Sequence, residues 1–264
     1  MKKTLITAIS AVLFLFVSSG SALAQEEEGE KITVTPVEAF VCKYKDGKGW
    51  DDLNKVNEKW NAWADDRDLN DYFAVNMFPH FHSDFESLDF VWVGAYRNGN
   101  AMGAGTDAWL NEGGDLAEQY AEMSSCSTVA SFIGMTLRPP KDDGDDESDN
   151  QFVVSFSDCS LTSEEDGAWD EFMAANNEWN AYADEHGIAG SRYLWWPSAG
   201  ESPDADYDFK LIGAWDDHTM RGATWQQFAD GHWQKDWELF NDKLDCNSSR
   251  MYNAWVVREM GDEE

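Results

Sequence analysis

The sequence predicts an α+β fold made of two tandem copies of one unit. Short motifs recur at a constant spacing of 119 residues, so that residues 50–53 (WDDL) return as 169–172 (WDEF) and residues 60–65 (WNAWAD) as 179–184 (WNAYAD). Each half also repeats the same order of expected strands and helices, and the four cysteines occupy matched places in the two halves. A duplicated gene accounts for all three observations.

Each half is expected to contain a strand, a helix, two strands, a helical region and a closing strand. Apolar residues alternate along 34–44, as in a half-buried strand, and repeat with helical spacing along 50–66. The first half continues with strands at 71–78 and 88–96, a turn-rich stretch at 98–105, a helical region at 106–123 and a strand at 128–138. The second half has expected strands at 152–157, 192–196, 208–215 and 249–259 and helical regions at 169–186 and 219–244. The order β-α-β-β-α-β is that of the ferredoxin-like unit.

The two ends and the middle of the chain have different compositions. Residues 1–24 combine two lysines, an apolar run and small residues before a cleavage site, the features of a secretory signal peptide. The apolar run is shorter than the roughly 20 residues that span a bilayer. We therefore expect a secreted or periplasmic protein, and Gln25 at the cut excludes a lipoprotein cysteine there. The expected segments are a signal peptide (1–24), an acidic tail (25–31), a first repeat (32–138), an acidic Pro/Asp-rich linker (139–150) and a second repeat (151–264).

The chain is strongly acidic. Without the two lysines of the signal peptide, 17 basic side chains face 51 acidic ones, a net charge of −34. Such a surface repels nucleic acids and anionic membranes, and we expect neither as a partner. The acidic residues are spread along the chain, which favours a role in solubility over a dedicated cation site.

Four cysteines in a secreted chain are expected to pair, and three pairings are open. In a ferredoxin-like sheet the end of the first strand lies beside the start of the last. This places Cys42 beside Cys126 and Cys159 beside Cys246, which predicts one disulfide within each half. The cysteines are too far apart in sequence for a zinc or redox motif.

Two ferredoxin-like units in one chain, each with an aromatic-rich first helix, resemble a fused dimeric α/β-barrel protein. The resemblance implies an intramolecular barrel in which two sheets pack face to face and the helices cover the outside. That superfamily includes oxygenases and isomerases that need no cofactor as well as haem proteins. Since no family motif is matched, no functional residue is carried over, and the fold alone does not choose an activity.

The first helix of each half carries amides within an otherwise apolar stripe. A buried amide must find a hydrogen-bond partner, either a backbone carbonyl or a ligand in a pocket between helix and sheet. The tryptophans of the stripe are expected to belong mainly to the core and could line such a pocket. The candidate ligand-binding residues are Asn57, Trp60, Asn61, Asn176, Trp179 and Asn180.

Histidines are few. His80 and His82 are two residues apart near a strand end, a spacing that can hold a metal ion, with Asp84 and Glu86 nearby. The second half has no matched pair at 198–201, which favours a chance arrangement. No histidine is placed as a haem ligand in either half. We therefore predict no cofactor.

Two further matched pairs of charged residues have structural interpretations. Asp89 and Asp208 begin the third strands and are interpreted as edge or turn residues. Arg138 and Arg258 end the last strands and are expected to form local ion pairs.

Three functions remain open. The preferred one is a small-ligand-binding protein whose Trp-lined helix–sheet pockets hold an apolar or aromatic molecule. The first alternative is an enzyme of the oxygenase or isomerase kind, which requires a titratable group with a shifted pKa in the pocket. The second is a protein-interaction module with exposed tryptophans. Neither the catalytic residues nor the oligomeric state follows from the sequence.

Overall fold

The computed structural model describes residues 34–141 and 150–261. The predicted signal peptide, the acidic tail and most of the predicted linker therefore lie outside the described residues.

Both halves contain the predicted succession of strands and helices, and the predicted fold class is confirmed. The first half comprises β1 (Val34–Tyr44), α1 (Trp50–Asp65), β2 (Tyr72–Phe81), β3 (Phe90–Tyr96), α2 (Gly99–Glu112), α3 (Gly114–Met123) and β4 (Ser124–Arg138). The second half comprises β5 (Gln151–Leu161), α4 (Ala168–Glu185), β6 (Ser191–Ala199), β7 (Phe209–Trp215), α5 (His218–Gln227), the π-helical turn η1 (Phe228–His232), α6 (Trp233–Phe240), β8 (Leu244–Cys246) and β9 (Arg250–Arg258).

Two local predictions are wrong. The stretch 98–105 is not a loop, because α2 begins at Gly99. The side chain of Asn98 accepts hydrogen bonds from the N–H groups of Asn100 and Ala101, both 3.0 Å, and this cap offsets the low helix propensity of the glycines. The single helical region expected at 219–244 is divided into α5, η1 and α6, with a kink at Gly231, whose φ is 124°.

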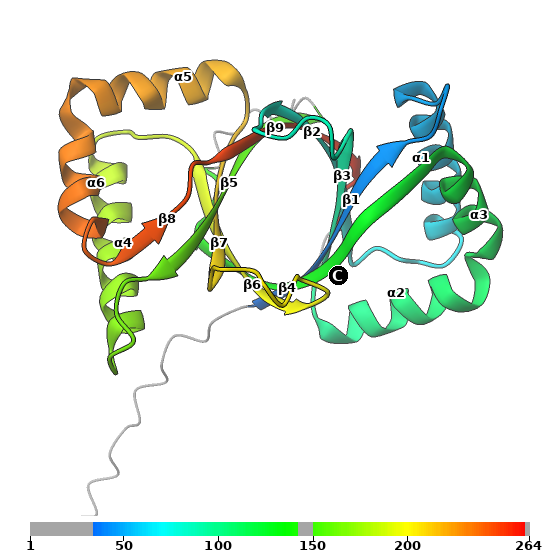
Figure 1. Cartoon of the computed structure of the whole chain (residues 1–264), viewed down its shortest axis with the longest axis horizontal. Helices are drawn as coiled ribbons and strands as arrows, with labels where there is room; N and C mark the ends of the chain where they lie inside the picture. Colours follow the sequence, from blue (N-terminus) through cyan, green and yellow to red (C-terminus); the bar gives the residue numbers. More distant parts are fainter. Residues whose placement is uncertain (1–33, 142–149, 262–264) are drawn as a thin grey trace, which may run out of the picture. The chain divides into compact units, whose positions relative to one another are not determined.

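The strands close into one barrel of eight strands, in the order β7-β6-β4-β1-β3-β2-β9-β5, with β7 paired to β5 and β8 added beside β5. Each half contributes the ferredoxin-like order, β4-β1-β3-β2 in the first and β9-β5-β7-β6 in the second. The pairs β4–β6 and β2–β9 join the halves, so the two sheets expected to lie face to face are continuous with each other. Helices α1–α3 cover the first-half strands from outside, and α4–α6 cover those of the second half (Figure 1).

The barrel interior is lined mainly by apolar side chains from both halves. Strand alternation directs one face of each strand inward, and the buried interior residues include Val37, Val75, Val93, Phe132, Phe156 and Ala254. The opposite faces pack against the helices. The outer face of the first-half sheet therefore meets α1–α3, and this is the layer in which the candidate site lies.

The first helix of each half is hydrogen-bonded to the last strand of the other half. The Asn61 amide in α1 donates to the carbonyl oxygen of Val257 in β9 at 2.7 Å. The matched Asn180 in α4 donates to the carbonyl oxygen of Leu137 in β4, also at 2.7 Å. The duplication has thus kept a contact that joins the two repeats.

Arginines at the ends of the last strands reinforce the same junction. The side chain of Arg138 lies 2.8 Å from Asp184 in α4, and that of Arg258 lies 2.7 Å from Asp65 in α1. These ion pairs cross between the halves, although the sequence suggested local pairs. Asp184 and Asp65 are largely exposed, so each pair is expected to contribute little to stability by itself.

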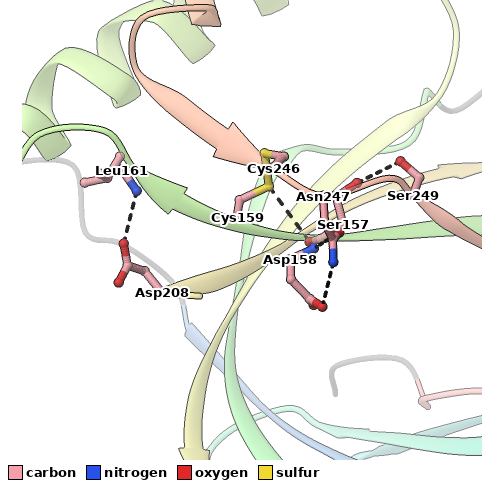
Figure 2. Close-up of a disulfide and its surroundings, with 8 residues drawn as sticks. All are labelled: Ser157, Asp158, Cys159, Leu161, Asp208, Cys246, Asn247 and Ser249. Atoms are coloured by element: carbon pink, nitrogen blue, oxygen red, sulfur yellow. Dashed lines mark hydrogen bonds between the residues drawn. A yellow bond between two sulfur atoms is a disulfide. The ribbon is translucent and has the colours of Figure 1, made fainter. Parts of the chain in front are cut away.

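The predicted disulfides Cys42–Cys126 and Cys159–Cys246 are both present, with sequence separations of 84 and 87. Two such bridges are typical of an oxidising compartment. Beside the second, the carboxylate of Asp208 accepts from the N–H of Leu161 at 3.0 Å (Figure 2). The matched Asp89 accepts from the N–H of Tyr44 at 2.7 Å. These aspartates hold the ends of β5 and β1, in keeping with the edge role assigned to them.

Over the described ranges, no helix has both the length and the apolar character that crossing a membrane requires.

An ionic cluster occupies one end of the barrel interior. Asp158 on β5 lies 2.9 Å from Lys210 on β7 and 2.7 Å from Arg250 on β9. Burial by itself raises the pKa of Asp158, but the hydrogen bonds and charges of Arg250 and Lys210 outweigh burial and lower this pKa from 3.8 to about 2. Ionised Asp158 is therefore stabilised in the folded protein.

Replacing Asp158 with Asn is expected to lower the free energy of unfolding by about 2 kcal/mol at pH 7, the value of a pKa lowered by this amount. The stabilisation is present above the unfolded pKa near 4 and is lost as the pH falls through about 2. Urea unfolding at pH 7 and at pH 2 measures this difference, with the exposed Asp166→Asn as the matched control. Equal losses in the two variants at pH 7 would contradict the prediction.

Candidate functional site

A cavity of about 510 Å³ lies between the first-half helices and the outer face of the first-half sheet. Nine of the 21 residues that line it are aromatic: Phe40, Trp60, Trp63, Tyr72, Phe90, Trp92, Tyr96, Trp109 and Tyr120. Several rings meet edge to face, including Trp60 with Trp92 at a centroid distance of 5.1 Å and Trp63 with Trp109 at 5.5 Å. Such contacts hold the rings in defined orientations.

Strand alternation places one carboxylate in this aromatic wall. Val37 of β1 faces the barrel interior, so the next residue, Glu38, faces the helices and lines the cavity. The register of β1 with β3 sets Glu38 opposite Gly94. Two residues along, Phe40 lies opposite Trp92 on the same face.

Three aromatic side chains form a hydrogen-bond network around Glu38. The hydroxyl of Tyr72 donates to Glu38 Oε1 at 2.6 Å, and that of Tyr96 donates to the same oxygen at 3.5 Å. Trp92 Nε1 donates to the Tyr72 hydroxyl at 3.1 Å. Among the described residues no donor is bonded to Glu38 Oε2, so this oxygen can still accept a hydrogen bond from a molecule in the cavity.

The surroundings change the protonation of this group. Burial raises the pKa of Glu38 above its ordinary 4.5, and the hydrogen bonds from Tyr72 and Tyr96 offset only part of the rise. Burial and the neighbouring carboxylate also raise the pKa values of Tyr72 and Tyr96 above 10, which keeps both hydroxyls protonated as donors. A buried carboxylate with a raised pKa is a stronger proton acceptor than an exposed one.

Two glycines allow the tyrosines to reach Glu38. A Cβ atom at Gly94 would lie 1.8 Å from the Tyr72 hydroxyl oxygen, so only glycine leaves room for that side chain to cross the strand. A Cβ atom at Gly105 in α2 would lie 2.8 Å from the ring of Tyr96. The hydrogen-bond network around Glu38 therefore requires that Gly94 and Gly105 have no side chain, as well as requiring Tyr72 and Tyr96.

Replacing Gly94 with Ala is expected to push Tyr72 away from Glu38 and to cost about 1–3 kcal/mol of stability through overpacking. Urea unfolding measures the cost. Gly103 in α2 has open space around its Cβ position, and Gly103→Ala is the control, expected to stabilise the protein by up to about 1 kcal/mol. A Gly94→Ala protein as stable as the wild type would show that Tyr72 does not occupy this position.

In the second half, the layer between the helices and the sheet is a packed core. Its helix–sheet layer is packed with buried side chains that include Phe172, Trp179, Leu194, Phe209 and Phe240. At the positions that match Tyr72, Trp92 and Tyr96 by the repeat spacing, the chain has Ser191, Leu211 and Trp215. The carboxylate network thus belongs to the first half alone.

The candidate residues of the first helix lie around the cavity. Trp60 lines it. Asn57 is buried, and its side-chain oxygen accepts from the hydroxyl of Tyr120 at 2.9 Å, so it holds a residue of the cavity wall. Asn61 is bonded to β9 as described above. Of these three, Trp60 is the one that lines the cavity.

The matched candidates in α4 contact protein groups. Asn176 is fully buried and donates to the carbonyl oxygen of Leu137 at 3.3 Å, the same oxygen that accepts from Asn180. Trp179 is part of the second-half core. The side-chain oxygens of Asn176 and Asn180 are buried without a partner among the described residues.

His80 and His82 lie away from this cavity. The ring of His80 is 4.8 Å from that of His218, and His82 Nδ1 accepts from the N–H of Asp84 at 3.0 Å. In the part of the chain that the structure describes, no group of three or more His, Cys, Asp or Glu side chains is arranged to hold a metal ion.

Three exposed tryptophans lie in the second half, whereas the first half has Trp50 at 38% exposed. Trp225 in α5 and Trp237 in α6 are each 64% exposed, and Trp233, one turn before Trp237, is 50% exposed.

The carboxylate and its aromatic donors were not selected from the sequence. Glu38 is one of 51 acidic residues, and the tyrosines resemble ordinary strand residues. One usable signal was present: the duplication makes unmatched positions visible, and Tyr72, Trp92 and Tyr96 all differ from their counterparts in the second repeat.

No protein-family model matches this sequence, and no curated protein is similar enough to match it. Solved structures are similar in fold. An anthrone oxidase-like protein is 10% identical, with a TM-score of 0.50 over 88% of this chain and 96% of that one. A heme-binding protein from Thermus thermophilus is 8% identical, with a TM-score of 0.48 over 85% and 94%. A mutant chlorite dismutase from Candidatus Nitrospira defluvii is 8% identical, with a TM-score of 0.49 over 86% and 93%.

The chain therefore has a dimeric α/β-barrel fold, formed within one polypeptide by two tandem ferredoxin-like units. Identities this low show the fold alone. The prediction that no cofactor is used is corrected by these comparisons, because the neighbours include a heme-binding protein. The placement of the histidines in the sequence was not a sufficient reason for that prediction.

Proposed function

We propose that the first-half cavity binds a small aromatic molecule bearing an O–H or N–H group that donates to Glu38. The observation that carries the proposal is a carboxylate oxygen, Glu38 Oε2, left free of described donors among aromatic side chains, whereas the other two carboxylates of the wall, Asp68 and Asp71, are exposed. A volume of about 510 Å³ lies within the range of small-molecule sites, which are mostly apolar with a few placed polar groups. The surrounding rings supply stacking and edge contacts to a planar ligand.

The raised pKa of Glu38 favours a second candidate function, proton transfer on the bound molecule. A carboxylate in this setting can take a proton from an acidic O–H or C–H group of the ligand, while Tyr72 and Tyr96 hold its other oxygen. This is the type of step that isomerases and oxygenases of small aromatic molecules require. If the protein is an enzyme of this kind, Glu38 is its general base.

The residues around this cavity do not fit a haem. Protein ligands to haem iron are His, Cys thiolate, Met or Tyr. Among the described residues that line the cavity there is neither His nor Met, and its two cysteines are joined in a disulfide. The hydroxyls of Tyr72 and Tyr96 are bonded to Glu38, and that of Tyr120 to Asn57. No step is therefore assigned to a haem here.

The proposal includes a secreted or periplasmic location. Two disulfides and the composition of residues 1–24 support it. The acidic surface disfavours nucleic acids and anionic membranes as partners.

Isothermal titration calorimetry with 1-naphthol and 1-methoxynaphthalene tests the binding proposal. The two probes share the ring system, but only 1-naphthol can donate to Glu38. We expect 1-naphthol to bind at least about tenfold more tightly, since hydrogen bonds to charged groups contribute about 1.5–3 kcal/mol. Equal affinities, or no saturable binding of either probe, would refute it.

The proton-transfer candidate has its own test. In D₂O at pH 7, the wild-type protein is expected to accelerate deuterium exchange at the acidic C–H positions of 2-tetralone, measured by NMR. The Glu38→Gln variant is expected to leave only the background rate. Equal rates in the two proteins would exclude Glu38 as the base.

A further inference from the structure

A second cavity, of about 330 Å³, opens on the inner face of the barrel sheet. Strand alternation separates it from the first cavity: Ala39 and Val41 of β1 line the inner cavity, whereas Glu38 and Phe40 line the outer one. Both halves contribute to the inner cavity, and its remaining wall includes Phe132, Phe156 and Trp195.

The two repeats place opposite chemistry at matched positions around this cavity. When β1 and β5 are aligned on their disulfide cysteines, Cys42 and Cys159, Val41 matches Asp158. Val41 is paired with Val91, whereas Asp158 is paired with Lys210. Ala39 is paired with Ala130 in the first half, as Phe156 is with Arg250 in the second. The first-half wall around these residues is therefore apolar, with His82, Ser83, Ser87 and Thr128 as its polar members, whereas the second-half wall carries the charges.

On the charged side, Lys210 and Arg250 between them have an N–H donor that no described residue accepts from. Lys210 and Arg250 share the single carboxylate of Asp158, and the next acid, Glu201, is 3.7 Å from Lys210. Both cations are largely withdrawn from solvent, with side chains 17% and 24% exposed. Arg250 Nε is buried and has no hydrogen-bond partner among the described residues. A buried donor without a partner is costly and favours a ligand that supplies an acceptor.

We propose that this inner cavity binds a small amphipathic carboxylate. Its carboxylate group accepts from Arg250 and Lys210 on the second-half side, and its apolar body lies against Val41, Val91 and Ala130 on the first-half side. Two carboxylates, Asp158 and Glu201, balance the charges of Lys210 and Arg250. The buried Arg250 Nε without a partner, and not the net charge, favours a ligand that supplies an acceptor over an amine. The site is independent of the aromatic cavity and does not rest on the function proposed for it.

The test is calorimetric titration of the full mature chain with octanoate, octan-1-ol and octylamine, which share one alkyl chain. Octanoate is expected to bind saturably with one molecule per chain, and the alcohol and amine at least about tenfold more weakly. This comparison uses only the wild-type protein and stays decisive if a variant fails to fold. Absence of saturable octanoate binding up to millimolar concentration, or equal affinity for octan-1-ol, would overturn the proposal.

Two variants locate the site. Arg250→Gln removes the unused donor, and Ala39→Phe fills the apolar side with the residue found at the matched place in the second half. Each is expected to weaken octanoate binding at least about tenfold. Glu38→Gln, on the opposite face of the sheet, is the control and is expected to leave it unchanged. Loss of octanoate binding in Glu38→Gln, with retention in the other two variants, would place the ligand in the aromatic cavity and overturn the inner site.

Discussion

Replacing Glu38 with Gln is expected to weaken 1-naphthol binding at least about tenfold while stabilising the ligand-free protein at pH 7. Gln keeps the shape and the oxygen that accepts from Tyr72, but it carries no charge to attract the donor of the ligand. The loss follows because the Gln oxygen stays bonded to Tyr72 and the group that faces the ligand becomes an N–H donor, so the hydrogen bond from the ligand to a charged acceptor, about 1.5–3 kcal/mol, is removed.

The gain in stability follows from the direction of the pKa shift. Burial raises the pKa of Glu38 above 4.5, so ionising this group costs more in the folded chain than in the unfolded chain. The native state therefore loses stability as the pH rises from the unfolded pKa through the folded pKa. Gln removes that cost, and the variant should be more stable at pH 7 but not at pH 3, where Glu38 is protonated in both states.

Calorimetry and urea unfolding at the two pH values measure both effects. Glu58, an exposed residue of α1, provides the matched control Glu58→Gln, which should change neither binding nor stability appreciably. If Glu38→Gln destabilised the protein at both pH values and left binding intact, Glu38 would be a structural residue that holds the two tyrosines.

Removing either disulfide is expected to cost about 4.5 kcal/mol of unfolding free energy, but only one removal should disturb the aromatic cavity. The bridges close loops with sequence separations of 84 and 87, so the chain-entropy model gives nearly equal losses. Cys42 and Cys126 line the cavity, whereas Cys159 and Cys246 lie in the other repeat. The duplication thus supplies a control of equal stability cost.

The experiment compares the double variants Cys42→Ala/Cys126→Ala and Cys159→Ala/Cys246→Ala by urea unfolding and by 1-naphthol titration. Stability should fall alike in both, and affinity should fall only in the first. A similar loss of affinity in both variants would mean that global loosening changes the cavity and that the nearby bridge has no local effect.

The sequence alone predicts the features that depend on short stretches of chain and on their repetition. Alternating and helical patterns mark the strands and helices, the repeat spacing shows that the order occurs twice, and this order pairs Cys42 with Cys126. The sequence-based predictions are wrong where the same residues suit two local structures, a turn or the start of a helix. Residues 98–105 contain glycines typical of a turn, yet the Asn98 cap is enough to begin a helix there.

Tertiary structure alone decides how the repeats join and where the polar groups meet. Closure of the barrel depends on β4 and β9 pairing with strands of the opposite repeat, which no local pattern reveals. Glu38, Tyr72 and Tyr96 come from three strands, and their meeting requires both the register of those strands and the missing side chain at Gly94. Secondary structure follows from interactions between near neighbours in the chain, whereas a binding site follows from distances between residues far apart in it.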